Sequence, residues 1–263
     1  MPSPLLNEEL LASMLEVIKG ADTVELKLTV PDTQMRATAV NLGLDPIEAE
    51  IRQIVFFDTP DLALNASGLV VRARRIQKGA GDTVIKLRPV DPRELPREHS
   101  RIGVEVDAMP GGFVCSASMK GTSSAKDIAK TIAGDASIKS LFSKGQRSFY
   151  KEHAPEGLKL KDLVALGPIL TLRLKSLPQG FGRKLVTELW LYPDGSQILE
   201  LSTKCAPGEA IQVAAEARVF LTARGIDMTG VQQTKTKTAL EYFSSLMATT
   251  SGTRLASNPK ESE

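Results

Sequence analysis

The chain has 263 residues, of which 42% are apolar, so it can build a sizeable core and is not a wholly disordered protein. Lys and Arg total 33 against 31 Asp and Glu, and the net charge of +2 argues against a surface that coats nucleic acid. With only two cysteines, Cys115 and Cys205, the chain cannot form a disulfide scaffold. It contains no run of about 18 apolar residues, so the sequence predicts no membrane span. We therefore expect a cytoplasmic protein that binds neither nucleic acid nor membrane.

Apolar residues at helical spacing predict an amphipathic helix over residues 5–19, which Gly20 ends. Further helices are predicted from residue 32 to about 42, in a short segment after Pro46, and over residues 124–132, 137–142, 209–224 and 236–247. Residues 248–263 are rich in Ser, Thr, Lys and Glu, and we expect a disordered tail there. Residues 1–247 are expected to form one domain.

Alternating apolar and polar residues predict eight strands, over residues 24–30, 53–58, 69–76, 82–90, 102–109, 169–177, 184–192 and 197–204. Asp194 and Gly195 between the last two strands are typical of a tight hairpin, so we expect antiparallel neighbours. The strand pattern lapses between Gly111 and Gly167, and we interpret this part as a helical insertion.

Charged residues two positions apart share one face of a strand. Five predicted strands carry such a doublet: Glu25 with Lys27, Arg72 with Arg74, Lys86 with Arg88, Glu105 with Asp107, and Arg173 with Lys175. Glu188 and Glu200 stand on the last two strands. If the strands close into a barrel with their apolar faces outward, these charges line a polar lumen, and a chain of phosphates with divalent metals supplies partners of both signs. An open sandwich whose charged faces meet water is the alternative.

Three motifs carry a family resemblance: residues 56–61 (Phe-Phe-Asp-Thr-Pro-Asp), residues 68–74 with Arg72 and Arg74, and residues 84–88 with Lys86 and Arg88. In this order they resemble the CYTH superfamily, the triphosphate tunnel metalloenzymes, which include inorganic triphosphatases, thiamine triphosphatase and class IV adenylyl cyclases. The resemblance implies an α+β fold, namely an eight-stranded antiparallel β-barrel with helices packed outside, which binds triphosphates with Mg²⁺ or Mn²⁺.

Two family carboxylates are missing from this chain. The first strand of the family reads Glu-x-Glu-x-Lys, but here Thr23 precedes Glu25 and Lys27. The late Glu-x-Glu strand is reduced to Glu200 and Ser202. Both losses fall on metal ligands.

The resemblance and the charge doublets together assign roles to the charged residues. The groups expected to bind phosphate oxygens are Lys27, Arg72, Arg74, Lys86, Arg88, Arg173, Lys175 and Lys235. Lys27 and Lys86 are also expected to be catalytic. Glu25 with Glu200 is expected to hold the metal, and a second metal would depend on Glu105, Asp107 or Glu188.

The function we expect is metal-dependent hydrolysis of a triphosphate, and the substrate we expect is inorganic triphosphate. Cyclisation of ATP to cyclic AMP and non-catalytic binding of polyphosphate or a phosphorylated metabolite remain the alternatives. Trp190 and Tyr192 share the strand face of Glu188, where they either stack on a base or pack near a tunnel mouth. The expected partner is a small-molecule triphosphate or polyphosphate, and a homodimer stays open.

Overall fold

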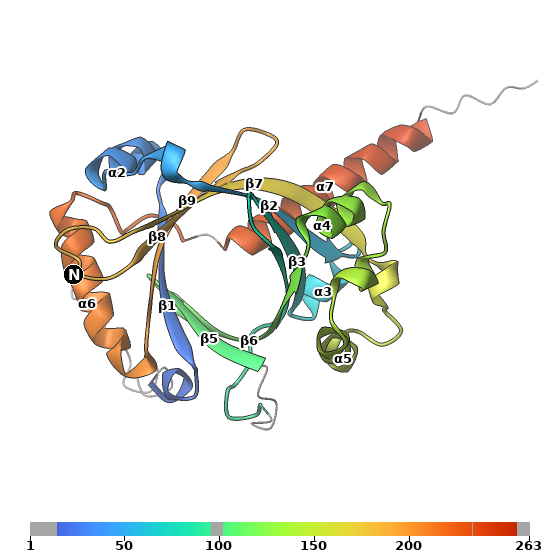
Figure 1. The fold of residues 1–263 in the computed structure, drawn as a ribbon, viewed down its shortest axis with the longest axis horizontal. Coiled ribbons are helices and arrows are strands. Elements are labelled where there is room, and N and C mark those ends of the chain that lie inside the picture. Colours follow the sequence, from blue (N-terminus) through green and yellow to red (C-terminus); the bar gives the residue numbers. More distant parts are fainter. Residues whose placement is uncertain (1–14, 96–101, 233, 257–263) are drawn as a thin grey trace, which may run out of the picture.

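The computed structural model describes residues 15–95, 102–232 and 234–256. Within these residues nine strands close into a barrel, in the order β1-β5-β6-β4-β3-β2-β7-β8-β9, and helices pack outside it (Figure 1). The strands are β1 Thr23–Val30, β2 Glu50–Asp58, β3 Leu69–Ile76, β4 Gly81–Leu87, β5 Ile102–Met109, β6 Gly112–Ser123, β7 Val164–Ser176, β8 Leu185–Leu191 and β9 Gln197–Cys205. The predicted α+β barrel with outer helices is confirmed, and all eight predicted strands are present.

The ninth strand, β6, is where the sequence prediction was wrong. It lies at the start of the predicted helical insertion and contains small residues such as Ser116, Ala117 and Ser118, which are weak strand formers. Hydrogen-bonded pairing with β4 on one side and β5 on the other holds it in place. The helical part of the insertion therefore spans only residues 124–163.

The pairing of β1 with β5 is parallel, whereas the other neighbouring pairs of the barrel are antiparallel. The prediction of a purely antiparallel barrel was therefore wrong at this one seam. A parallel pair cannot be joined by a tight hairpin, and here residues 31–101 lie between the two strands in the sequence. This long connection contains β2, β3 and β4.

The helices are α2 Met35–Asn41, α3 Ala63–Ala66, α4 Ala125–Ala133, α5 Lys144–His153, α6 Ala210–Ala223 and α7 Lys235–Ala256. Short 3-10 helices are Asp32–Gln34, Pro46–Glu48, Ile138–Leu141, Leu160–Asp162 and Pro207–Glu209. Of the predicted N-terminal helix, residues 15–19 are helical and its earlier part lies outside the described residues. Helix α7 continues to Ala256, so the tail predicted to begin at residue 248 starts inside a helix.

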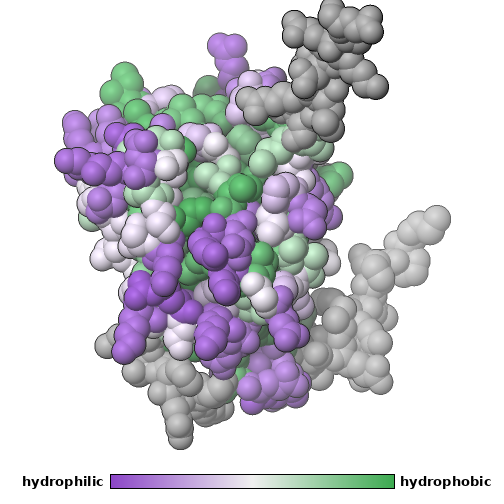
Figure 2. Space-filling model, turned by 90° about the vertical axis from the view of Figure 1, so that its right-hand side faces the viewer, coloured by the Kyte–Doolittle hydropathy of each residue, from purple (hydrophilic) through white to green (hydrophobic). Residues whose placement is uncertain are grey.

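The main hydrophobic core lies outside the barrel wall, between the strands and the helices. On one side Val71 and Ile85 pack with Ile128 of α4 and Phe149 of α5. On the opposite side α6 contributes Phe220 to a second cluster. Figure 1 shows helices flanking the barrel on these two sides, and Figure 2 shows hydrophilic side chains over the lower half and the upper left of the side that carries α4 and α5. None of the described helices is long and apolar enough to span a membrane.

A third cluster fills one end of the barrel interior. Phe56, Trp190 and Ile198 share their strand faces with the inward-facing charges, and they pack against Leu240 and Phe243 of α7. Helix α7 therefore covers this end of the barrel, and the charged residues lie beyond the apolar layer.

The packing of β3 against the outer helices allows a test of which face of the strand points outward. Val71 is 1% exposed, and a carboxylate at this position would be buried without a partner, so Val71→Asp should lower the free energy of unfolding by about 3 kcal/mol or more. The matched control is Ile47→Asp, which changes a residue that is 90% exposed and should alter stability by no more than about 0.5 kcal/mol. Chemical denaturation of both variants measures this, and equal stabilities would show that the apolar faces are not the packed ones.

Candidate functional site

Strand register brings the charged doublets of separate strands together inside the barrel. Glu25 of β1 is paired with Asp107 of β5 on one side and with Lys204 of β9 on the other. Arg173 of β7 is paired with Glu188 of β8, which is paired in turn with Glu200 of β9. Two groups of charges result, one around β1 and β5 and one around β8 and β9.

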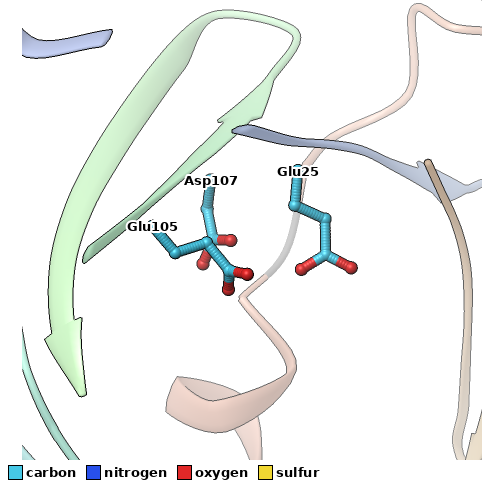
Figure 3. Close-up of side chains that lie close together, drawn as sticks. All are labelled: Glu25, Glu105 and Asp107. Carbon is cyan, nitrogen blue, oxygen red and sulfur yellow. The ribbon is translucent and has the colours of Figure 1, made fainter. Parts of the chain in front are cut away.

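The first group contains three carboxylates. Each of Glu25, Glu105 and Asp107 offers an oxygen, and these oxygens lie within 4.8 Å of one another. Figure 3 shows Glu105 and Asp107 side by side on β5, with Glu25 opposite them on β1. Three carboxylates so close together require cations nearby, because their mutual repulsion is strong away from bulk water.

Lys27 and Lys86 supply two of these cations. The Nζ of Lys27 lies 2.8 Å from Asp107 Oδ1 and 3.4 Å from Glu25 Oε2. The Nζ of Lys86 lies 3.4 Å from Asp107 Oδ2 and 3.8 Å from Glu105 Oε1. Burial alone would lower the pKa of Lys27, but the surrounding carboxylates outweigh burial and raise it well above its usual range. Burial alone would raise the pKa of Asp107, but Lys27 and Lys86 outweigh burial and lower it.

Lys204 supplies the third cation, and the sequence analysis missed it. Its Nζ contacts Glu105 Oε2 and lies 3.6 Å from Glu25 Oε2. The signal was present in the alternation of β9, where Lys204 continues the inward-facing series of Glu200 and Ser202.

The second group surrounds Lys235, the first residue of α7. Its Nζ lies 2.6 Å from Glu188 Oε2 and 2.7 Å from Glu200 Oε1. Arg173 Nε lies 3.2 Å from Glu188 Oε1, and the Trp190 indole donates a hydrogen bond to Glu188 at 3.3 Å. Burial works against ionisation of Glu188, but Lys235 and its other partners hold the pKa of Glu188 well below its usual range.

The carboxylates predicted to bind metal are therefore divided. Glu25 lies with Glu105 and Asp107, whereas Glu188 and Glu200 lie against the Lys235 ammonium. Lys235 was predicted to contact phosphate, and in the structure it links α7 to the barrel interior.

Arg72 and Arg88 differ from the other inward-facing cations. No carboxylate of the described residues lies within salt-bridge distance of either guanidinium. Arg72 Nε is buried and, within the same part of the chain, has no hydrogen-bond partner. Burial, together with the neighbouring Arg74, lowers the pKa of Arg72 to about 10. Arg74 itself is neutralised by Asp82, at 2.8 Å.

Lys175 is the one member of the five predicted doublets that is exposed. It lies near the end of β7, two residues beyond the half-buried Arg173. The structure therefore places the predicted site residues other than Lys175 in three settings: the two charged groups, the ion pair of Arg74 with Asp82, and Arg72 and Arg88, which have no salt-bridge partner among the described residues.

The carboxylate cluster fits a hard divalent cation in the chemistry of its donors, because Mg²⁺ and Mn²⁺ prefer carboxylate oxygens. Each of the three carboxylates is also within 4.0 Å of at least one lysine Nζ. A divalent cation at this place therefore competes with ammonium groups that already neutralise the cluster.

No family model matches the sequence, and no curated protein matches it. The fold does match solved structures. A protein from Hippeastrum, described as a candidate adenylyl cyclase with a dominant triphosphatase activity, is 17% identical with a TM-score of 0.57, over 80% of this chain and 91% of its own. A candidate adenylate cyclase from Bacillus halodurans is 12% identical with a TM-score of 0.58, over 82% of this chain and 97% of its own. At these identities the likeness shows a shared barrel fold.

The ion pairs of Glu188 predict a specific dependence of stability on pH. Because its pKa is depressed in the folded state, Glu188 stabilises the fold above its ordinary pKa of 4.5, and this contribution is lost as the pH falls below that value. At pH 7, Glu188→Gln should lower the free energy of unfolding by about 3 kcal/mol. The difference between wild type and variant should shrink by up to about 1.4 kcal/mol for each pH unit below 4.5. Urea denaturation from pH 7 to pH 3 measures it, and a constant difference would contradict the pairing.

Proposed function

We propose that the barrel interior binds inorganic triphosphate and hydrolyses it with Mg²⁺ or Mn²⁺, as the resemblance to the CYTH superfamily implies. The observation that carries the proposal is Arg72, whose Nε is buried without a hydrogen-bond partner among the described residues. No carboxylate of those residues lies within salt-bridge distance of its guanidinium, and Asp82 and Glu188 act on its charge only from farther away. A buried unpaired guanidinium is costly to the fold, so its presence favours a ligand that brings negative charge. A planar guanidinium also matches the oxygens of a phosphoryl group.

The charged residues divide the task according to their partners. Arg72 and Arg88, which have no carboxylate of the described residues within salt-bridge distance, would bind phosphate oxygens. Lys27 and Lys86 lie within ion-pair distance of the carboxylate cluster, and they would neutralise the transferring phosphoryl group as catalytic residues. Hydrolysis of a phosphoric anhydride needs little covalent help from a protein, so positioning and charge neutralisation account for most of the rate.

The residues that would hold the metal are Glu25, Glu105 and Asp107. When bound, a divalent cation supplies charge neutralisation and Lewis acidity at phosphoryl oxygens. Glu200, which we expected to hold the metal with Glu25, is not part of this cluster and lies instead with Glu188 against Lys235.

The surroundings of the aromatic residues support inorganic triphosphate over a nucleotide. Trp190 and Tyr192 are 2% and 5% exposed and pack against α7, so neither presents a free ring face for a base. Cyclisation of ATP is the second candidate function, because both structural neighbours are described as candidate adenylyl cyclases.

One assay separates these functions. Wild-type protein is incubated with inorganic triphosphate or ATP and either Mg²⁺ or Mn²⁺, and phosphate, pyrophosphate and cyclic AMP are measured together. Release of phosphate and pyrophosphate from triphosphate supports the proposal, whereas cyclic AMP from ATP supports the cyclase. Binding without turnover in either metal would overturn hydrolysis and leave a binding protein.

The cost of Arg72 to the fold gives a prediction with two opposite effects. Arg72→Met should weaken triphosphate binding by at least about tenfold, because a charge-assisted contact is lost. The same variant should raise the free energy of unfolding, because an unpaired buried charge is removed.

The control for this prediction is Arg75→Met, on the same strand. Arg75 is exposed and bonds to Gln53, so its replacement should leave both binding and stability nearly unchanged. Calorimetric titration and denaturation measure the two effects. If Arg72→Met lost stability and kept its affinity, Arg72 would be a structural residue.

The missing family carboxylate gives a further prediction. Thr23 Oγ1 lies 3.5 Å from Glu105 Oε2, so Thr23→Glu adds a fourth carboxylate to the cluster. Triphosphate affinity should fall without metal, because the added charge repels phosphate, and should rise with Mn²⁺. Thr23→Gln is the neutral control. A change of equal sign and size in both conditions would show that Thr23 is not at the metal position.

A further inference from the structure

Lys204 bridges two carboxylates that belong to different strands. It lies on β9, where its backbone pairs with that of Glu25 of β1. Its ammonium contacts Glu105 of β5 and lies 3.6 Å from Glu25 Oε2. One cation therefore joins carboxylates of β1 and β5, the two strands that form the parallel seam of the barrel.

The cluster is electrically balanced by the chain itself. The three carboxylates Glu25, Glu105 and Asp107 face three ammonium groups, those of Lys27, Lys86 and Lys204. A divalent cation added to this arrangement would leave an excess of positive charge. The cluster can accept such a cation only if an ammonium group withdraws or if a polyanion binds at the same time.

Lys204 is the ammonium that can withdraw most easily. Its side chain is 49% exposed, compared with 19% for Lys27 and 20% for Lys86. A lysine has a flexible stem of four carbons, so a half-exposed lysine can move its charge into water at a lower cost than a lysine that lies deeper. Lys27 and Lys86 lack this route because they lie deeper among the carboxylates.

An ordinary surface ion pair is the plain alternative for Lys204, and such pairs contribute little. The geometry argues against it. The facing oxygens of Glu25 and Glu105 lie within 4.8 Å of each other, and among the described residues the other ammonium groups within 4.0 Å of these two carboxylates are those of Lys27 and Lys86. Burial would lower the pKa of Lys204, but the two glutamates outweigh burial and raise it.

We propose that Lys204 is an internal cation that takes the place of a divalent metal between Glu25 and Glu105, and thereby sets the metal affinity of the site. Phosphate binding then does not depend on metal, and a metal gains access when Lys204 withdraws. The statement about phosphate rests on the proposed function, whereas the statement about metal does not.

Direct titration with Mn²⁺, without any phosphate compound, tests the metal statement. Lys204→Met should bind Mn²⁺ at least about tenfold more tightly than wild type, because removing one ammonium about 4 Å from a divalent ion relieves more than 1.4 kcal/mol of repulsion. Calorimetry and the electron paramagnetic resonance signal of free Mn²⁺ report this affinity independently of activity. Lys204→Arg keeps the charge and should behave as wild type.

Two further variants locate the effect. Adding Glu105→Gln to Lys204→Met should abolish the gained Mn²⁺ site, because one of its three carboxylates is lost. Lys130→Met, which changes an exposed lysine of α4, should leave the Mn²⁺ affinity unchanged. Equal Mn²⁺ affinity of wild type and Lys204→Met, with both proteins folded by circular dichroism, would overturn the proposal.

Titration with inorganic triphosphate tests the phosphate statement. Wild type should bind triphosphate without metal, and Lys204→Met should lose at least about fivefold in affinity under that condition and regain it with Mn²⁺. If wild type binds no triphosphate in any condition, the proposed function fails, while the Mn²⁺ titration still decides the role of Lys204. If wild type bound triphosphate only with added Mn²⁺, the proposed role of Lys204 as an internal cation would be contradicted.

Discussion

Charges enclosed by a barrel must be neutralised by other charges at close range, because little water is present to screen them. Closure of the barrel places every second residue of each strand inside, and this chain fills many of those positions with Lys, Arg, Glu and Asp. The register of β1, β5 and β9 then decides which charges meet. The two charged groups follow from this requirement, and so do the ion pairs that Lys235 at the start of α7 makes with Glu188 and Glu200.

The charges inside the barrel are not all neutralised to the same extent. Around Glu25 and Asp107 the chain provides as many ammonium groups as carboxylates, and around Glu188 it recruits Lys235 from a helix outside the sheet. Arg72 receives no such partner from the described residues. Because one place in the interior has an unpaired arginine and another is already supplied with cations, we propose that anion and metal binding are coupled through the lysines.

Much of this arrangement was predictable because strand alternation is a local property of the sequence. The eight predicted strands and the inward direction of Arg72 and Lys86 depend only on which residues alternate. Strand β6 escaped prediction because its serines and alanines carry a weak pattern, and its two neighbours stabilise it. Local sequence pattern does not encode tertiary pairing. It therefore did not predict the parallel seam, the contacts of Lys204 or the ion pair of Glu200 with Lys235.

We propose that Arg72 is held unpaired for an anion, and nuclear magnetic resonance can observe this group directly. The side-chain Nε–H signal of Arg72, assigned by its absence in Arg72→Met, is followed while inorganic triphosphate is added to wild-type protein. The account predicts a shift that saturates at about one triphosphate per chain, because a single interior site binds the anion, with little change at the exposed Arg75. An Arg72 signal that stays in place while triphosphate binds elsewhere would contradict the account.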